Sequence, residues 1–244
     1  MRLLQAGRDV NRATQAETGQ VASGFKAWVN TRVGGGCRGA FATLCDTELD
    51  DGDVLIRVCY AAVTRGDARI SAGSGPLPGR LPCVGGSDLA GEVIASTAPR
   101  FRPGDPVIAT GYALGIKHHG AFAERALLPG GWVSPLPAPL DMQLCMTLGT
   151  AGLAVAMAIS RLEEGGLKPE RGPVLVTSAE HGYGTLAVAL CAARGYELVA
   201  LSQHPGSEGW LRALGASKVV ISGSAEYAAI RQNTRALWAA AIDN

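Results

Sequence analysis

The C-terminal half of the chain repeats one pattern, in which short, almost continuously apolar segments alternate with segments typical of helices. The pattern predicts strands over 173–177, 196–202, 218–222 and 236–242, and helices over 185–194, 207–214 and 225–233. Strands that are apolar along their whole length are typical of a parallel sheet covered on both faces. The sequence therefore predicts a doubly wound α/β domain.

The preceding residues have a different texture, with short apolar runs separated by Gly- and Pro-rich turns. Strands are predicted over 25–29, 52–60, 89–94 and 107–110, with a further strand and turn over 37–49. A helix N-capped by Asp141 is predicted to run to about Ile159. We expect three parts: an N-terminal extension over 1–24, a barrel-like β-domain over 25–137, and the α/β domain over 138–244.

Charge and cysteine usage narrow the classes of partner. The formal net charge of +1 gives no strong field for nucleic acid or anionic lipid. We expect no stretch to approach the roughly 18 apolar residues that a transmembrane helix needs, and residues 1–24 lack the apolar core of a signal peptide. The six cysteines form no C-x-x-C pair, which favours buried, reduced thiols over a zinc or disulfide framework. We expect a cytoplasmic protein without a metal.

The turn after the first parallel strand, over 177–185, is the candidate phosphate loop. Its glycines allow a dinucleotide pyrophosphate to approach the backbone at the start of the next helix. Contacts to the cofactor are expected from Ala179, Gly182, Gly184 and Thr185. Glu180 opposes this interpretation, because its carboxylate repels a pyrophosphate unless the side chain points away.

The second parallel strand ends in Ser202 and Gln203, which are further candidates for cofactor contact. An acidic residue at this position holds the ribose hydroxyls of NAD, whereas its absence favours the 2′-phosphate of NADP. The absence of an acid favours NADP, although no Lys or Arg follows to bind the phosphate. An α/β domain with an empty site is the alternative.

Several collinear segments carry a family resemblance. They are 52–58 (GDVLIRV), 86–91 (GSDLAG), 99–105 (PRFRPGD), 120–125 (GAFAER), 148–152 (LGTAG), 174–177 (VLVT) and 211–217 (LRALGAS). With them the chain resembles the zinc-independent quinone oxidoreductase and acrylyl-CoA reductase branch of the medium-chain dehydrogenase/reductase superfamily. The resemblance implies a GroES-like β-domain followed by a Rossmann domain, transfer of hydride from NADPH to an activated double bond of a small molecule, and no metal. It also implies cofactor contacts by Gly149, Thr150 and Ala151.

The chain departs from the family pattern where the chemistry is expected. The family's Asn-Tyr-Lys-Asp stretch reads Thr-Arg-Gly-Asp over 64–67, and His119 replaces a tryptophan. Arg65 is a candidate for stabilising a developing enolate, and Asp67 or His119 for relaying a proton. The alternatives are a solvated Arg65, an Asp67 that anchors a turn, and a His119 that packs in a loop.

The chain is also shorter than the family pattern, and its Rossmann domain is expected to be truncated after the strand over 236–242. We expect a homodimer or a partner chain to cover the sheet edge left there. Three hypotheses remain at this point. They are an NADPH-dependent reductase of a quinone, enone or enoyl thioester; a reductase-derived cyclase, isomerase or binding protein that has lost the cofactor; and a fragment of a longer reading frame.

Overall fold

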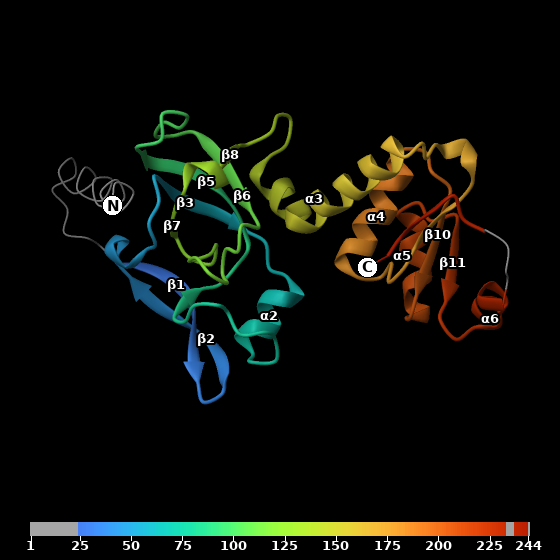
Figure 1. Cartoon of the computed structure of the whole chain (residues 1–244), viewed down its shortest axis with the longest axis horizontal. Coiled ribbons are helices and arrows are strands. Elements are labelled where there is room, and N and C mark those ends of the chain that lie inside the picture. The colour runs from blue at the N-terminus through green and yellow to red at the C-terminus, as the bar shows by residue number, and fades with distance from the viewer. Residues whose placement is uncertain (1–23, 233–236, 244) are drawn as a thin grey trace. The chain divides into compact units, whose positions relative to one another are not determined.

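The computed structural model describes residues 24–232 and 237–243, and the chain divides into two compact units, Met1–Thr150 and Ala151–Asn244. Figure 1 shows the course of the chain. The extension predicted over 1–24 lies outside the described residues, apart from Gly24. The two units are described separately below.

The first unit is built from two antiparallel sheets. In the smaller sheet, β1 (Phe25–Val33) lies between β2 (Gly36–Leu44) and β4 (Cys83–Val84). The larger sheet has the order β7-β3-β5-β6-β8, with β3 at Val54–Ala61, β5 at Asp88–Ser96, β6 at Pro106–Thr110, β7 at Arg125–Leu128 and β8 at Ser134–Pro135. The strands predicted in this half of the chain are therefore confirmed. The short β4, β7 and β8 were not predicted.

The core of the larger sheet explains why these strands form. Val54, Ile56, Leu89, Val107 and Leu128 are buried together, on alternate positions where a strand contributes two of them. Leu55 and Leu127, at the intervening positions, are buried in a separate small cluster, so β3 and β7 are covered on both faces at this point. Two single-turn 3-10 helices, η1 (Asp46–Glu48) and η2 (Gly130–Trp132), occupy the connections.

A short helix, α2 (Arg65–Ser71), follows β3 and was missed by the sequence analysis. A reciprocal capping box starts it. The Thr64 hydroxyl accepts the Asp67 N–H at 3.1 Å, and the Asp67 carboxylate accepts the Thr64 N–H at 2.9 Å. These bonds satisfy two donors that a helix start otherwise leaves unpaired. The signal was present in the sequence, but Asp67 was interpreted there as a catalytic candidate or as the anchor of a turn, and no helix was predicted.

The long helix α3 (Met142–Glu164) begins as predicted and runs past Ile159. Asp141 caps it, because its carboxylate accepts the Leu144 N–H at 2.7 Å. The helix is broken at Gly149, whose φ of 49° and ψ of −155° are not helical. A residue with a Cβ rarely adopts that φ, so glycine at this position permits the break.

By length and composition α3 is apolar enough to cross a membrane, with a mean hydropathy of 1.7 over its best window. The expectation that no such stretch exists was therefore wrong. The two halves of α3 nevertheless have partners within the protein. Cys145 and Met146 are buried in the first unit, and Val155 and Ile159 belong to the core of the second. Because 28% of the window is buried and this is a single helix among the described residues, its length and composition are weak evidence for a membrane span.

The second unit is a parallel four-stranded sheet, and the predicted α/β alternation is confirmed. Its elements are β9 (Val174–Val176), α4 (Gly182–Ala193), β10 (Leu198–Ser202), α5 (Glu208–Ala213), β11 (Lys218–Ile221), α6 (Ala225–Gln232) and β12 (Ala240–Ile242), with η3 (Pro169–Arg171) and η4 (Pro205–Ser207) in the connections. The strand order is β11-β10-β9-β12. Because the chain leaves β9 on one side and later returns on the other, the sheet is doubly wound.

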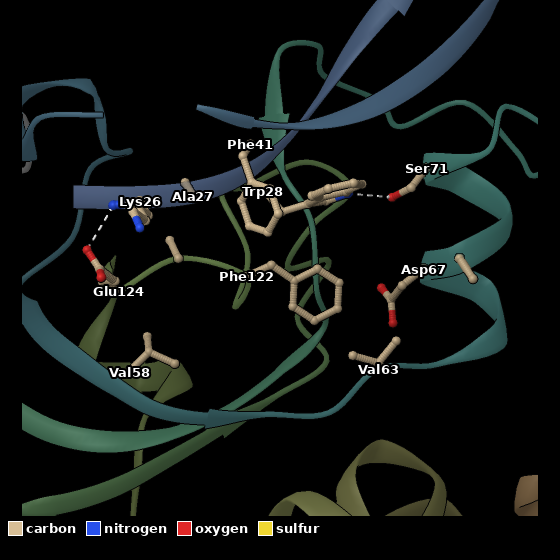
Figure 2. Close-up of a pocket in the computed structure, with 12 residues that line it drawn as sticks. Lys26, Ala27, Trp28, Phe41, Val58, Val63, Asp67, Ser71, Phe122 and Glu124 are labelled. Carbon is tan, nitrogen blue, oxygen red and sulfur yellow. Dashed lines mark hydrogen bonds between the residues drawn. The ribbon is translucent and has the colours of Figure 1, made fainter. Parts of the chain in front are cut away.

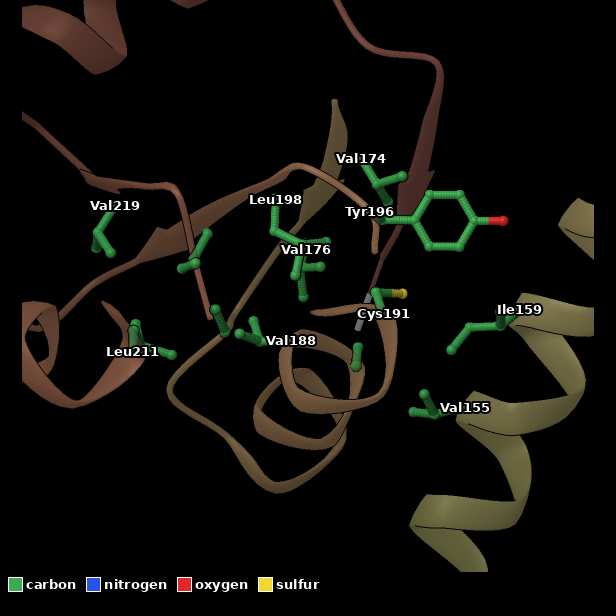
Figure 3. Packing of buried hydrophobic residues seen from close by; sticks show 14 of the residues in the cluster. Val155, Ile159, Val174, Val176, Val188, Cys191, Tyr196, Leu198, Leu211 and Val219 are labelled. Carbon is green, nitrogen blue, oxygen red and sulfur yellow. The ribbon is translucent and has the colours of Figure 1, made fainter. Parts of the chain in front are cut away.

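The core of this unit packs the helices against the sheet. Figure 3 shows Val188 and Cys191 of α4 directed towards Val176 of the central strand, with Ile159 of α3 facing Cys191. The Tyr196 hydroxyl lies 3.2 Å from a Glu163 carboxylate oxygen, so its polar end is paired. Burial of this cluster fixes the register of α4 on the sheet, and α4 carries the candidate phosphate loop at its start.

Candidate functional site

The turn between β9 and α4 is held against the end of β10. The Ala179 N–H donates to the Leu201 carbonyl at 3.0 Å, and the Thr185 hydroxyl donates to the Ala179 carbonyl at 3.1 Å. Ser178 has a φ of 45°, in the left-handed region that favours glycine. The turn is therefore tied down at both ends.

Two glycines in this turn have different roles. A Cβ on Gly184 would lie 2.4 Å from the Ser178 carbonyl oxygen, so only glycine permits this contact between helix and turn. A Cβ on Gly182 would meet nothing within 4 Å, so open space lies over this position. Close packing at one glycine and an open approach at another is what a dinucleotide turn requires.

The start of α4 is open to an anion. His181 is the N-cap residue, but its side chain makes no capping hydrogen bond. His181, Gly182 and Tyr183 are exposed. The first N–H groups of a helix have no partner within the helix, and the helix dipole places partial positive charge there. These residues fit the pyrophosphate of a dinucleotide.

Glu180 does not point at this helix start. Its Oε1 accepts the backbone N–H of Gln203 at 3.0 Å, so the side chain crosses to the end of β10. Burial raises the pKa of Glu180, but the Gln203 N–H, the nearby Ser202 hydroxyl and the charge of His181 together outweigh it, and the pKa lies below its ordinary value. The carboxylate is therefore ionised at neutral pH, at the end of β10.

Ser202 and Gln203 stand where the sequence analysis placed them, at the carboxyl end of β10. The Ser202 side chain is buried and bonded within its own turn, since its Oγ accepts the His204 N–H at 3.1 Å and lies 2.8 Å from the Ser207 hydroxyl. Gln203 is exposed, and its N–H is bound by Glu180. The predicted residues of the second unit, from Ala179 to Gln203, therefore meet at one edge of the sheet.

The first unit contains an apolar cavity of about 540 Å³ between β1, α2 and β3 (Figure 2). It is lined by Lys26, Ala27, Trp28, Phe41, Val58, Val63, Asp67, Ala68, Ser71, Phe122, Ala123 and Glu124. The Trp28 indole N–H donates to the Ser71 hydroxyl at 3.1 Å, and this hydroxyl donates to the side-chain amide oxygen Oδ1 of the buried Asn30 at 2.9 Å. The volume and the apolar lining are typical of a small-molecule site.

Of the three predicted catalytic residues, Asp67 alone lines this cavity. Its carboxylate is engaged in the capping box of α2, which is the turn-anchoring role that the sequence analysis left open. Arg65 is exposed in the first turn of the same helix. It is near Asp67 in the sequence, but no hydrogen bond joins the two side chains.

His119 is buried away from the cavity lining and is built into the fold. Its Nδ1 accepts the Val84 N–H at 2.9 Å, and its own N–H donates to Asp50 at 2.6 Å. Burial, reinforced by the positive charge of Arg80, lowers the pKa of His119 to about 4. A neutral imidazole that already accepts a backbone bond has a packing role, which is the alternative named for it above.

Gly149 and Thr150 lie at the break in α3, at the end of the first unit, and Ala151 begins the second unit. The Thr150 N–H donates to Asp88, whose side chain is 1% exposed. The contribution of these three residues to cofactor binding remains a prediction.

Sequence reasoning missed three features of the site. Glu180 was noted only for its charge, although its bond to Gln203 decides where that charge lies. Asp88 was quoted within a motif, but its contact with Thr150 spans 62 residues and leaves no local signal. The cavity aromatics Trp28, Phe41 and Phe122 come from separate strands and loops, so no spacing pattern could have found them.

Within the described residues, no cluster of three or more His, Cys, Asp or Glu side chains could hold a metal ion. All six cysteines are free thiols, and four of them are buried. Burial raises the pKa of Cys83 and of Cys191 to about 11, so these two thiols are protonated and unreactive at neutral pH.

A β-rich unit followed by a doubly wound parallel unit with a glycine turn defines the architecture of a medium-chain dehydrogenase/reductase. The model of the alcohol dehydrogenase GroES-like domain matches residues 50–138. A Bacillus subtilis protein assigned as a quinone oxidoreductase, YhfP, is 37% identical over 201 residues, which cover 82% of this chain and 61% of that protein. The acrylyl-CoA reductase AcuI of Ruegeria pomeroyi is 36% identical over 209 residues, covering 86% of this chain and 63% of that protein.

Solved structures agree with these sequence matches. Escherichia coli YhdH with bound NADPH has a TM-score of 0.84 at 35% identity, over 89% of this chain and 67% of that one. Bacillus subtilis YhfP with bound NAD has a TM-score of 0.78 at 38% identity, over 82% of this chain and 61% of that one. The chain belongs to the zinc-independent quinone oxidoreductase and acrylyl-CoA reductase branch of the medium-chain dehydrogenase/reductase superfamily. It spans about three fifths of the length of the curated relatives it matches.

Proposed function

We propose that the chain takes part in the reduction of an activated carbon–carbon double bond, in a quinone, an enone or an enoyl thioester, with a nicotinamide dinucleotide as hydride donor. The start of α4 carries this proposal: Gly182 is open, Gly184 packs closely, and the side chain of the N-cap residue His181 makes no capping hydrogen bond. Relatives assigned as quinone and acrylyl-CoA reductases support the reaction class. Relatives with bound NADP(H) support the cofactor predicted from the sequence, and YhfP binds NAD.

In this proposal the second unit binds the dinucleotide and the first unit binds the substrate. A bound dinucleotide supplies a hydride to the β-carbon of the substrate. In the second unit, the N–H groups at the start of α4 bind the pyrophosphate. In the first unit, the apolar cavity holds the body of the substrate and excludes water from it.

Charge develops on the substrate carbonyl oxygen as the double bond is reduced. Arg65 does not line the cavity itself, but it lies in the first turn of α2, the helix that contributes Asp67 and Ser71 to the lining, so we assign it the stabilisation of this oxygen. Asp67 remains a candidate for relaying a proton from solvent to the α-carbon, because it lines the cavity. His119 faces Val84 and Arg80, so the geometry favours Asp67 over His119 for this step.

Calorimetric titration of the 244-residue chain with NADPH and NADH tests the proposal, together with the oxidation of each by a simple quinone. We expect at least one dinucleotide to bind with a micromolar to millimolar dissociation constant. The Arg65→Ala variant should bind this dinucleotide equally well, but its turnover should be at least tenfold slower. Failure of both dinucleotides to bind at millimolar concentration would overturn the proposal. No finding favours the non-redox alternative.

The predicted homodimer and cytoplasmic location stand as parts of this proposal. β12 pairs with β9 along one of its sides and is the end strand of the sheet. Light scattering of the purified chain measures whether a second copy covers the other side of β12. A monomer at all concentrations would contradict the dimer prediction.

A further inference from the structure

Glu180 places an ionised carboxylate at the end of the second strand of the parallel sheet, although the strand itself ends without an acid. We propose that Glu180 selects against the 2′-phosphate of NADPH, so that this chain binds NADH more tightly than NADPH. This inference rests on the proposed function, since it concerns the dinucleotide that function requires.

The Glu180 carboxylate lies where the 2′-substituent of a bound dinucleotide is expected. In a doubly wound sheet, the adenosine ribose lies at the carboxyl end of the second strand, and its 2′-substituent meets the residues that follow that strand. Here those residues begin with Gln203, whose N–H is bound by Glu180 Oε1 at 3.0 Å. The Gln203 N–H, which would be a backbone donor for a 2′-phosphate, is therefore already bound by the Glu180 carboxylate. This carboxylate is negatively charged, as the phosphate is.

The neighbouring residues do not offset this charge. Neither the turn over 177–185 nor the segment over 202–207 contains a Lys or Arg. His181 and His204 are the only basic side chains in the two segments, and the Ser202 hydroxyl is already engaged by His204, Ser207 and the Glu180 carboxylate. A phosphate dianion at this position would meet Glu180 without a guanidinium or ammonium group to bind it.

The second carboxylate oxygen distinguishes ribose from phosphate. Glu180 Oε2 is buried and has no hydrogen-bond partner among the described residues. An ionised oxygen in this state is stabilised by a donor. The ribose of NADH offers the Glu180 carboxylate hydroxyl donors at both its 2′ and 3′ positions, whereas the ribose of NADPH keeps the 3′-hydroxyl and presents a negatively charged phosphate at the 2′ position. The same residue therefore attracts NADH and repels NADPH.

Equilibrium binding of NADH and NADPH to the whole chain tests the inference without any turnover. It is measured by calorimetry, and repeated with the fragments ADP and adenosine 2′,5′-bisphosphate. The variants are Glu180→Ser, which removes the charge and frees the Gln203 N–H, and Glu180→Gln, which removes the charge alone. Glu197→Gln is the matched control, because it removes an exposed carboxylate just before the opposite end of the same strand.

We expect the wild-type chain to bind NADH more tightly than NADPH. The ratio of the NADPH to the NADH dissociation constant should fall at least tenfold in Glu180→Ser, fall less in Glu180→Gln, and stay within twofold in Glu197→Gln. Wild-type preference for NADPH, or a ratio unchanged in both Glu180 variants while both dinucleotides still bind, would overturn this inference alone. Failure of either dinucleotide to bind any of the proteins would overturn the proposed function with it.

Discussion

The Asp88 carboxylate accepts the backbone N–H of Thr150 at 3.1 Å, and the Thr150 hydroxyl as well, directly after the helix break at Gly149. A buried strand residue thus holds the break in a helix 62 positions later. Because the other oxygen of Asp88 accepts the Ser87 hydroxyl at 2.7 Å, this carboxylate has all its bonds within the first unit.

We expect Asp88→Ala to destabilise the first unit by about 2–3 kcal/mol, because it leaves donors of Thr150 without an acceptor. Asp88→Asn keeps one carbonyl oxygen for Thr150 and should cost less than half as much. Hydrogen exchange measured by mass spectrometry should show lost protection over 149–152 in the alanine variant. Equal protection in both variants would contradict the role given to this contact.

The two glycines of the turn should respond oppositely to alanine. Gly184→Ala forces a Cβ to within 2.4 Å of the Ser178 carbonyl oxygen, so we expect a loss of stability of about 1–3 kcal/mol, measured by urea denaturation. The Cβ of Gly182→Ala would meet nothing within 4 Å, so the free energy of unfolding should be equal or slightly higher. The added methyl group nevertheless enters the space over the start of α4. We expect it to weaken dinucleotide binding at least fivefold. Unaltered binding would place the pyrophosphate elsewhere.

His119 should make the first unit acid-sensitive. Its folded pKa of about 4 lies below the ordinary value of 6.5, so the unfolded chain binds the proton more strongly. The contribution of the neutral His119 to the free energy of unfolding is therefore fully present above pH 6.5. It is lost as the pH falls towards 4, by about 3 kcal/mol in total. His119→Asn keeps an acceptor for the Val84 N–H but cannot titrate. Denaturation at several pH values should show a shallower loss over this window in the variant, and an identical slope would contradict the assignment.

The cavity of the first unit should control substrate binding separately from the cofactor. Val63 lines the cavity and is 77% exposed, so Val63→Trp should fill part of it without disturbing the core. We expect a rise in KM for an apolar quinone of at least fivefold, with the dinucleotide dissociation constant unchanged. Leu77→Trp is the control, since Leu77 is also exposed but does not line the cavity. A similar rise in both variants would exclude the cavity as the substrate site.

Several parts of the site could be read from local sequence, and the structure shows why. Gly182 and Gly184 lie within one turn, so their spacing between a buried strand and an apolar helix was sufficient to predict that turn, whereas their contact with a cofactor stays a prediction. The start of α2 was also encoded locally, in Thr64 and Asp67, but the same residues had a competing interpretation as a catalytic motif. The burial of His119 could not be predicted locally, because a histidine in a loop gives no sign in the sequence of whether its ring is buried.

The sequence by itself determined the architecture. Continuous apolar strands alternating with helices have few ways to be buried other than a parallel sheet, and short strands between Gly and Pro turns predict an antiparallel unit. The tertiary structure alone decided where the charges lie. Glu180 reaches Gln203 and Asp88 reaches Thr150 across 23 and 62 positions, because the fold brings strand ends and a helix break together. Apolar patterning is a periodic, local property, whereas the pairing of a carboxylate depends on contacts that exist only after the chain has folded.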